Sequence, residues 1–200
     1  MLRRIHSQYR KFRRDEGGTA VVETFLMFPT LFVACLATYV FFEAFRSQSN
    51  NLKAAYTISD ALSRRGGDTE GYVTGDYLNS MWRLHRFITT SNHDTSLRVS
   101  VISFDEDDND YFVCWSEAKG ELTPMSDGTL DTYVSGNKIP VLPDGQALIV
   151  VETQVAHEPI FTIGRDWTIV FEDMIVTAPR FTPQLKWSTT GNPAGEVGCF

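Results

Sequence analysis

The sequence predicts an α+β protein with a long N-terminal helix, a second helix and a small, mainly antiparallel β-sheet. Nineteen consecutive residues, from Thr24 to Phe42, carry no charge. The apolar residues that follow recur at helical spacing as far as Leu62. From residue 97 onward, runs rich in Val, Ile, Phe and Trp alternate with segments rich in Gly, Pro and Asp, which is typical of strands joined by turns.

The charges of the 200-residue chain are divided unevenly about the uncharged segment. Residues 1–18 hold six basic and two acidic side chains, although the whole chain has a net charge of -7. An acidic body argues against nucleic acid as a partner, because phosphates require a basic surface. A basic leader before an apolar helix is expected to stay in the cytoplasm and to orient the helix across the inner membrane.

The chain is therefore expected to have three parts. They are a basic leader (1–18), a transmembrane helix (19–43) and an extracytoplasmic part that continues the helix and forms the head (44–200). Nineteen helical residues span about 28 Å, close to the roughly 30 Å of a hydrocarbon core.

Four interpretations of the apolar segment compete. It could be an uncut membrane anchor. It could be a cleaved signal peptide, but no small-x-small cleavage site follows the segment. It could be a lipoprotein signal, since residues 32–35 loosely resemble a lipobox, but the residues after Cys35 stay apolar. The fourth interpretation is a prepilin-type signal that is cut ahead of the apolar segment.

The prepilin interpretation depends on Glu23, the fifth residue after Gly18. A carboxylate at the edge of an apolar helix is costly and usually has a role or a partner, although the helix dipole also favours an acidic residue in a first turn. Cleavage after Gly18 would give Thr19 a free amine with a pKa of about 8. In a bundle of such helices, the Glu23 carboxylate of one chain could then meet the amine of another.

The segment from Arg13 to Pro29 resembles the N-terminal signature of the TadE-like proteins, which are minor pseudopilins of the tight-adherence (Flp-type) pilus machinery. Residues 53–64 resemble the segment that follows the membrane helix in this family, and residues 149–152, 159–161 and 178–180 resemble it more weakly. Thr24 departs from the family pattern, in which an aromatic residue is common. Gly17 before Gly18 leaves two candidate cleavage positions, of which the spacing to Glu23 favours Gly18.

This resemblance implies a pilin-like head, cleavage by a prepilin peptidase and a role in assembling a type IV adhesive pilus for cell adhesion. The partners that it implies are the inner membrane, other pilins or pseudopilins and the proteins of the assembly platform. It implies no catalysis and no cofactor. A pseudopilin of a type II secretion system, an uncleaved bitopic scaffold and a membrane-anchored enzyme remain alternatives.

The elements are expected in the following order. The first helix runs from Ala20 to about Arg65, with a kink at Pro29, and a second helix follows Thr74 as N-cap with His85 in its apolar stripe. Residues 117–145 are turn-rich and are expected to form a long excursion with one short strand. Strands are expected at 97–104, 111–116, 147–155 and 167–176, with a turn at 164–166 and an irregular tail after Pro179.

The residues suggest two further features, a calcium-binding loop and a disulfide. Asp105, Asp107 and Asn109 match ligand positions of a calcium-binding EF-hand loop, but Asp110 and Ser116 stand where Gly and Glu are required, so a solvated acidic turn in the segment Asp105–Asp110 is favoured. Cys114 and Cys199 both belong to the extracytoplasmic part, where disulfides persist, and we hypothesise that they pair. The four histidines are dispersed, and no phosphate loop or zinc motif is present.

Overall fold

The computed structural model describes residues 17–65, 72–90, 94–161, 167–192 and 195–200. The chain divides into two compact units, with the boundary between Glu43 and Ala44. The second unit is called the head (44–200). The predicted turn at 164–166 lies outside the described residues.

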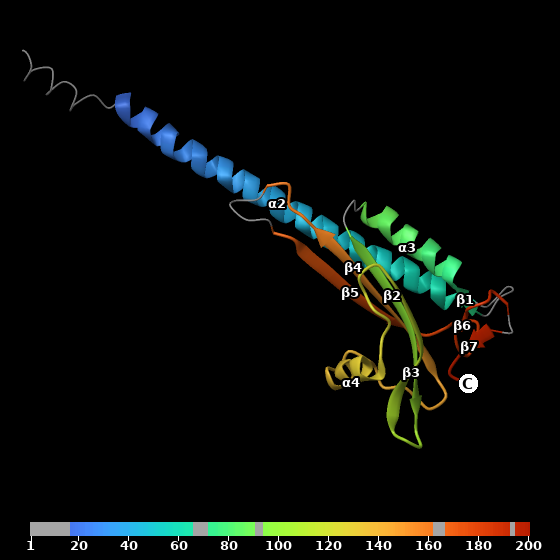
Figure 1. Cartoon of the computed structure of the whole chain (residues 1–200). Coiled ribbons are helices and arrows are strands. Elements are labelled where there is room, and N and C mark those ends of the chain that lie inside the picture. The colour runs from blue at the N-terminus through green and yellow to red at the C-terminus, as the bar shows by residue number, and fades with distance from the viewer. Residues whose placement is uncertain (1–16, 66–71, 91–93, 162–166, 193–194) are drawn as a thin grey trace, which may run out of the picture. The chain divides into compact units, whose positions relative to one another are not determined.

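Helix α2 (Gly17–Ser63) is 47 residues long and belongs to both units, so the predicted long helix is confirmed (Figure 1). Pro29 lies inside α2 without ending it. Proline has no backbone N–H and cannot complete the helical ladder at its own position. One residue later, the Thr30 hydroxyl donates a hydrogen bond to the carbonyl of Leu26 at 2.9 Å.

Within the head, the second part of α2 is amphipathic. Its buried residues recur at three- and four-residue intervals, as required for one face of a helix: Asn51, Ala54, Ala55, Ile58, Ser59, Leu62 and Ser63. Several of them are small, which lets the helix backbone approach the sheet closely.

Helix α3 (Gly75–Thr89) begins as the sequence predicts. The Thr74 hydroxyl accepts a hydrogen bond from the Tyr77 N–H, which satisfies one of the free donors of the first turn. Leu78 and His85 are buried on its inner face.

Four antiparallel strands form the main sheet, in the order β3–β2–β4–β5. They are β2 (Thr95–Asp105), β3 (Asp110–Lys119), β4 (Ala147–His157) and β5 (Ile169–Thr177). All four predicted strands are present, each within a few residues of its expected range. Most of β2 is buried, because both faces of the sheet are covered.

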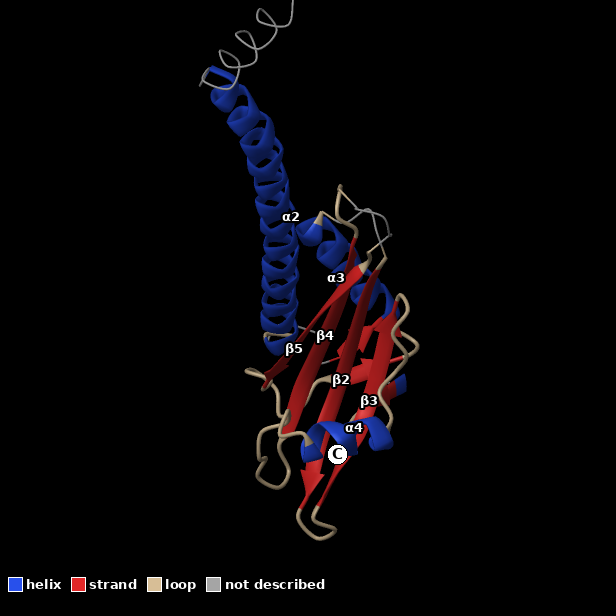
Figure 2. Cartoon of the chain, turned by 90° about the vertical axis from the view of Figure 1, so that its left-hand side faces the viewer, coloured by secondary structure: helices blue, strands red, loops and turns tan. Residues whose placement is uncertain are grey.

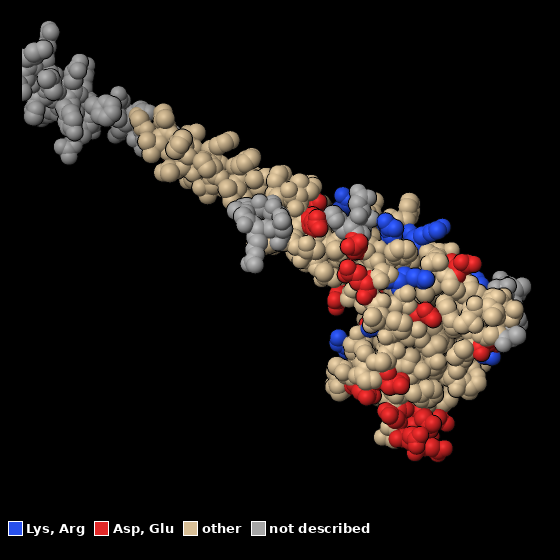
Figure 3. Space-filling model, viewed as in Figure 1, with Lys and Arg blue, Asp and Glu red and all other residues tan. Residues whose placement is uncertain are grey.

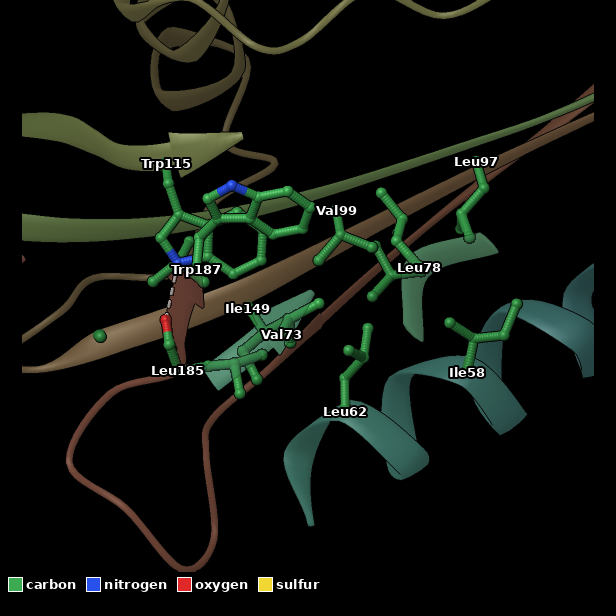
Figure 4. Packing of buried hydrophobic residues seen from close by; sticks show 13 residues of the cluster. Ile58, Leu62, Val73, Leu78, Leu97, Val99, Trp115, Ile149, Leu185 and Trp187 are labelled. Atoms are coloured by element: carbon green, nitrogen blue, oxygen red, sulfur yellow. Dashed lines mark hydrogen bonds between the residues drawn. The ribbon is translucent and has the colours of Figure 1, made fainter. Parts of the chain in front are cut away.

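One face of the sheet packs against α2 and α3. Ile58 and Leu62 of α2 and Leu78 of α3 join Val99 and Ile149 of the sheet in one apolar cluster (Figure 4). Within this cluster the Trp115 indole N–H donates to the carbonyl of Leu185 at 2.7 Å, and its ring lies 5.5 Å from that of Trp187.

The other face is covered by helix α4 (Asp127–Ser135) and the loops around it (Figure 2). Leu130 of α4 packs with Met125, Ile139 and Leu142 over Ile102 and Val150. The prediction of a long irregular excursion with one short strand was therefore wrong for this segment. Its turn residues flank a nine-residue helix that is too short for a clear helical period.

A second, three-stranded sheet also escaped the sequence analysis. Strands β1 (Tyr72–Thr74), β6 (Lys186–Ser188) and β7 (Glu196–Val197) pair in the order β1–β6–β7, and β1 and β6 are parallel. The expected irregular tail thus contains two strands of two or three residues. Such short strands have no detectable alternation, and β1 and β6 are more than a hundred residues apart.

Candidate functional site

The predicted processing residues lie in the first described turns of α2. Gly17 and Gly18 are already helical, so the expected cleavage position lies within the helix rather than ahead of it. Gly18 is exposed, and a Cβ added there would meet nothing within 4 Å. A larger residue at position 18 is therefore sterically tolerated by this fold.

Thr19 and Glu23 are four residues apart in this helix. Four helical residues rise by about one turn, so a new backbone amine at Thr19 would lie about one turn before Glu23. Glu23 is exposed and makes no hydrogen bond or ion pair with the residues that the structure describes. The carboxylate is therefore available to a group outside the described chain.

The surface around Glu23 is apolar and uncovered. Phe25, Leu26, Phe28, Leu31 and Phe32 are each more than half exposed. Two shallow hollows lie between these side chains, one lined entirely by Val21, Thr24, Phe25, Phe28 and Pro29, and the other bordered by Glu23. A second apolar helix could pack into such hollows.

Within the described residues, one helix is long and apolar enough to cross a membrane. Its most apolar 18-residue window has a mean hydropathy of 2.1, and none of that window is buried in the protein. A core helix of a globular domain would be mostly covered by the rest of the chain. The most apolar part of α2 is therefore not covered by any other part of the described chain.

In the head, Asn51 fixes α2 to three other elements. Its amide nitrogen donates to Asp173 Oδ2 on β5 at 2.7 Å and lies 3.5 Å from the Thr153 carbonyl on β4. Its amide oxygen lies 2.7 Å from His85 Nε2 on α3. Asn51 and His85 are fully buried. The sequence analysis missed Asn51, although its position in the apolar stripe of α2 was a signal that could have identified it.

The environment of His85 favours the neutral imidazole. Burial lowers its pKa to about 4, because a charged ring would lose its hydration. Since the Asn51 amide nitrogen faces Asp173, the Asn51 oxygen accepts the hydrogen from His85 Nε2. Nδ1 is buried and has no hydrogen-bond partner among the described residues. The expectation that His85 is a core residue rather than a ligand agrees with this position.

The structure joins Cys114 of β3 to Cys199 near the C-terminus in a disulfide, as hypothesised from the sequence. The β2–β3 ladder has a register shift at this cysteine. Val101 pairs with Trp115 and Ile102 pairs with Val113, so Cys114 is the extra residue of a β-bulge. Cys114 and Trp115 consequently pack against the same cluster, next to Cys199, whereas Val113 packs on the opposite face. Cys35 is a free, exposed cysteine on α2.

A buried ion pair lies on the face covered by α4. Arg98 on β2 and Glu152 on β4 are direct cross-strand neighbours, and the guanidinium donates to both carboxylate oxygens at 2.6 and 2.7 Å. Tyr133 of α4 donates to Glu152 at 2.7 Å, and burial together with this bond raises the pKa of Tyr133. The residues of this network satisfy one another, so they fasten α4 to the sheet and leave no free reactive group.

The acidic β2–β3 turn is exposed and is held by hydrogen bonds within the turn. Asp105 Oδ1 accepts hydrogen bonds from the N–H groups of Asp107 and Asp108, at 2.9 and 3.4 Å, and Asn109 has a φ of 50°. Among the described residues, no three His, Cys, Asp or Glu side chains are grouped closely enough to hold a metal ion.

Comparisons with protein-family models, with curated proteins and with solved structures find no match to this chain.

Proposed function

We propose that this chain is a minor pseudopilin of the TadE-like type, which is inserted in the inner membrane, cut by a prepilin peptidase and used to assemble an adhesive pilus. The observation that carries the proposal is the position of Glu23. It is an exposed carboxylate one helical turn after Thr19, on an apolar helix that continues without a break into the head. A pilin-like protein requires this combination of a membrane helix, an acidic residue near its start and a head carried on the same helix.

In this proposal the two ends of α2 have different roles. The apolar first part lies in the membrane and, during assembly, packs against the helices of neighbouring pilins through its hollows at Phe25, Phe28 and Pro29. The second part is held in the head by Asn51 and Leu62. A force applied to the helix is therefore transmitted directly to the sheet. The protein catalyses no reaction in this role and requires no cofactor.

Glu23 would act through a charge pair. After cleavage that follows Gly18, the amine of Thr19 and the carboxylate of Glu23 would carry opposite charges about one helical turn apart. In apolar surroundings, each of these two charges is stable only when it contacts an opposite charge. The Glu23 of one chain and the amine of its neighbour would thus set the register between two helices.

The mature N-terminus tests the proposal. The full chain is produced with a prepilin peptidase and its N-terminal residue is determined by sequencing and intact mass. We expect Thr19 as the first residue, and we expect Gly18→Ala to prevent the cut although the helix tolerates the added methyl group. Gly17→Ala is the matched control and should still be cut. An intact N-terminus in the presence of active peptidase would refute the assignment.

An uncleaved bitopic scaffold is the second candidate, and one observation favours it. Gly17 and Gly18 already belong to α2, so the expected cleavage position is not an extended segment in this structure. The same mass measurement separates the two candidates, because only the pseudopilin loses eighteen residues.

A further inference from the structure

The end of the head at which β4 and β5 are connected exposes a group of large apolar side chains. Ile160 and Phe161 follow β4, and Trp167 and Val170 lie at the start of β5. Their exposed fractions are 62%, 48%, 63% and 52%. We call these four residues the hairpin-end patch. Isolated apolar residues on a surface need no explanation, but a group of this kind indicates a contact.

The contacts of α2 show which end of the head this is. Asn51 contacts β5 at Asp173 and β4 at Thr153, whereas twelve residues later the carbonyl of Ser63 accepts a hydrogen bond from Arg180, beyond the end of β5. Helix α2 therefore runs in the same direction as β5. Its first residue in the head, Ala44, therefore lies toward the start of β5 and hence toward the hairpin-end patch. Figure 1 shows the head part of α2 and strand β5 running in the same direction.

Ala44 is also only two residues after Phe42, the last residue of the apolar segment. In the proposed function, the chain leaves the membrane just before Ala44. The patch would then lie at the end of the head where the chain enters the lipid.

The opposite end of the sheet is acidic instead of apolar. Ala147 at the start of β4 pairs with Ser103 of β2, and the β2–β3 turn follows just beyond it. This turn is exposed and holds Asp105, Glu106, Asp107, Asp108 and Asp110, and Figure 3 shows a group of acidic residues at this end of the head. Strands of eleven residues separate the two ends by about 35 Å. An acidic end is repelled by anionic lipid, whereas an apolar and aromatic end is attracted to the membrane interface.

We propose that the hairpin-end patch rests in the lipid interface, so that the head holds the membrane at a second place besides α2. Trp167 is the main anchor, because an indole ring with one apolar and one polar side prefers the headgroup level. Ile160, Phe161 and Val170 enter the adjacent acyl region. This inference rests on the membrane insertion of α2 that the proposed function requires, but it does not depend on cleavage or on pilus assembly.

Tryptophan fluorescence in a bilayer tests this contact. The full chain is reconstituted into vesicles of phosphatidylcholine and phosphatidylglycerol in which the phosphatidylcholine is brominated near the headgroup end of its acyl chains. Of the four tryptophans, Trp167 is exposed whereas Trp115 and Trp187 are buried and Trp82 is half-buried. We expect quenching relative to unbrominated vesicles, and we expect Trp167→Phe to remove most of it.

Two matched variants complete the test. Ile160→Ser should reduce the quenching of Trp167, whereas Val141→Ser should leave it unchanged, because Val141 is 93% exposed but belongs to the loop that precedes the distal start of β4. Equal quenching of the wild type and of Trp167→Phe would overturn the proposal. Quenching that is absent with lipid alone would also overturn it and would point instead to a protein partner for the patch.

Flotation of the same vesicles separates this failure from failure of the proposed function. A chain that does not float with lipid lacks a membrane helix, which contradicts the pseudopilin assignment. A chain that floats without quenching contradicts only the hairpin-end contact.

Discussion

Asn51 of α2 accepts a hydrogen bond from His85 of α3, with 2.7 Å between Asn51 Oδ1 and His85 Nε2, and both side chains are fully buried. The other side of the same amide donates to Asp173 at 2.7 Å. One side chain therefore satisfies polar groups of α3 and β5 at the same time. The contacts of α2 with the rest of the head thus include a residue that is neither apolar nor at a helix end.

Asn51→Ala should destabilise the head by about 3 kcal/mol, because a buried imidazole and a carboxylate each lose a hydrogen-bond partner. Chemical denaturation followed by tryptophan fluorescence measures the difference. Lys53→Ala, an exposed change on the same helix, should alter stability by less than about 0.5 kcal/mol. Similar effects of the two substitutions would show that the Asn51 contacts contribute little.

The stability of the head should fall between pH 6.5 and pH 4 through His85. Its pKa is lowered from 6.5 to about 4 in the folded state, so the unfolded chain binds the proton first as the pH falls. The contribution is fully present above pH 6.5 and decreases through this window, by about 3 kcal/mol at its lower end. Below pH 4 the contribution of His85 stays constant.

Measuring the free energy of unfolding against pH for the wild type and His85→Gln isolates this contribution from that of the carboxylates. The difference between the two curves should change across the window and be flat outside it. A constant difference from pH 7 to pH 4 would contradict the assignment of the pH dependence to His85.

Removing the Cys114–Cys199 disulfide should lower the stability of the head by about 4 kcal/mol, since the bond closes a loop across 85 residues of sequence. The double variant Cys114→Ala/Cys199→Ala is compared with the wild type by thermal unfolding, with and without reductant. Cys35→Ser serves as control and should have no effect on the head, because Cys35 is outside the disulfide. An unchanged transition under reducing conditions would show that the bond does not contribute.

Glu23→Gln should leave the protein produced and inserted but poorly assembled. The substitution keeps the shape of the side chain and removes the charge, so a charge-assisted bond of about 1.5–3 kcal/mol is lost, which weakens association about tenfold or more. Surface pili are quantified by shearing and immunoblotting. Glu43→Gln makes the same chemical change at the other end of the apolar segment and should assemble normally. Pilus output that matches the wild type in Glu23→Gln would remove the proposed role of this carboxylate.

Local sequence signals were sufficient for the longer helices and strands. The uncharged run from Thr24 to Phe42, the helical spacing up to Leu62, the Thr74 cap and the β-rich runs predicted α2, α3 and the four strands of the main sheet. Each of these signals lies within one continuous stretch of the chain. The Gly18–Glu23 spacing likewise needs only the chain itself, and its role stays a prediction.

Only the tertiary structure decided how the head is held together. The parallel pairing of β1 with β6, the Arg98–Glu152 ion pair and the Asn51–His85 hydrogen bond join residues that are 34 to more than a hundred positions apart. The bulge at Cys114 reverses the facing that strict alternation would give to Trp115, and helix α4 forms where the sequence shows mainly turn residues. These features depend on which surfaces come into contact after folding. A pattern of neighbouring residues does not predict such contacts. The sequence by itself determined a membrane-type helix that carries an α+β head. The folded chain decided which residues join the helices of the head to its sheet and which end of the head is apolar.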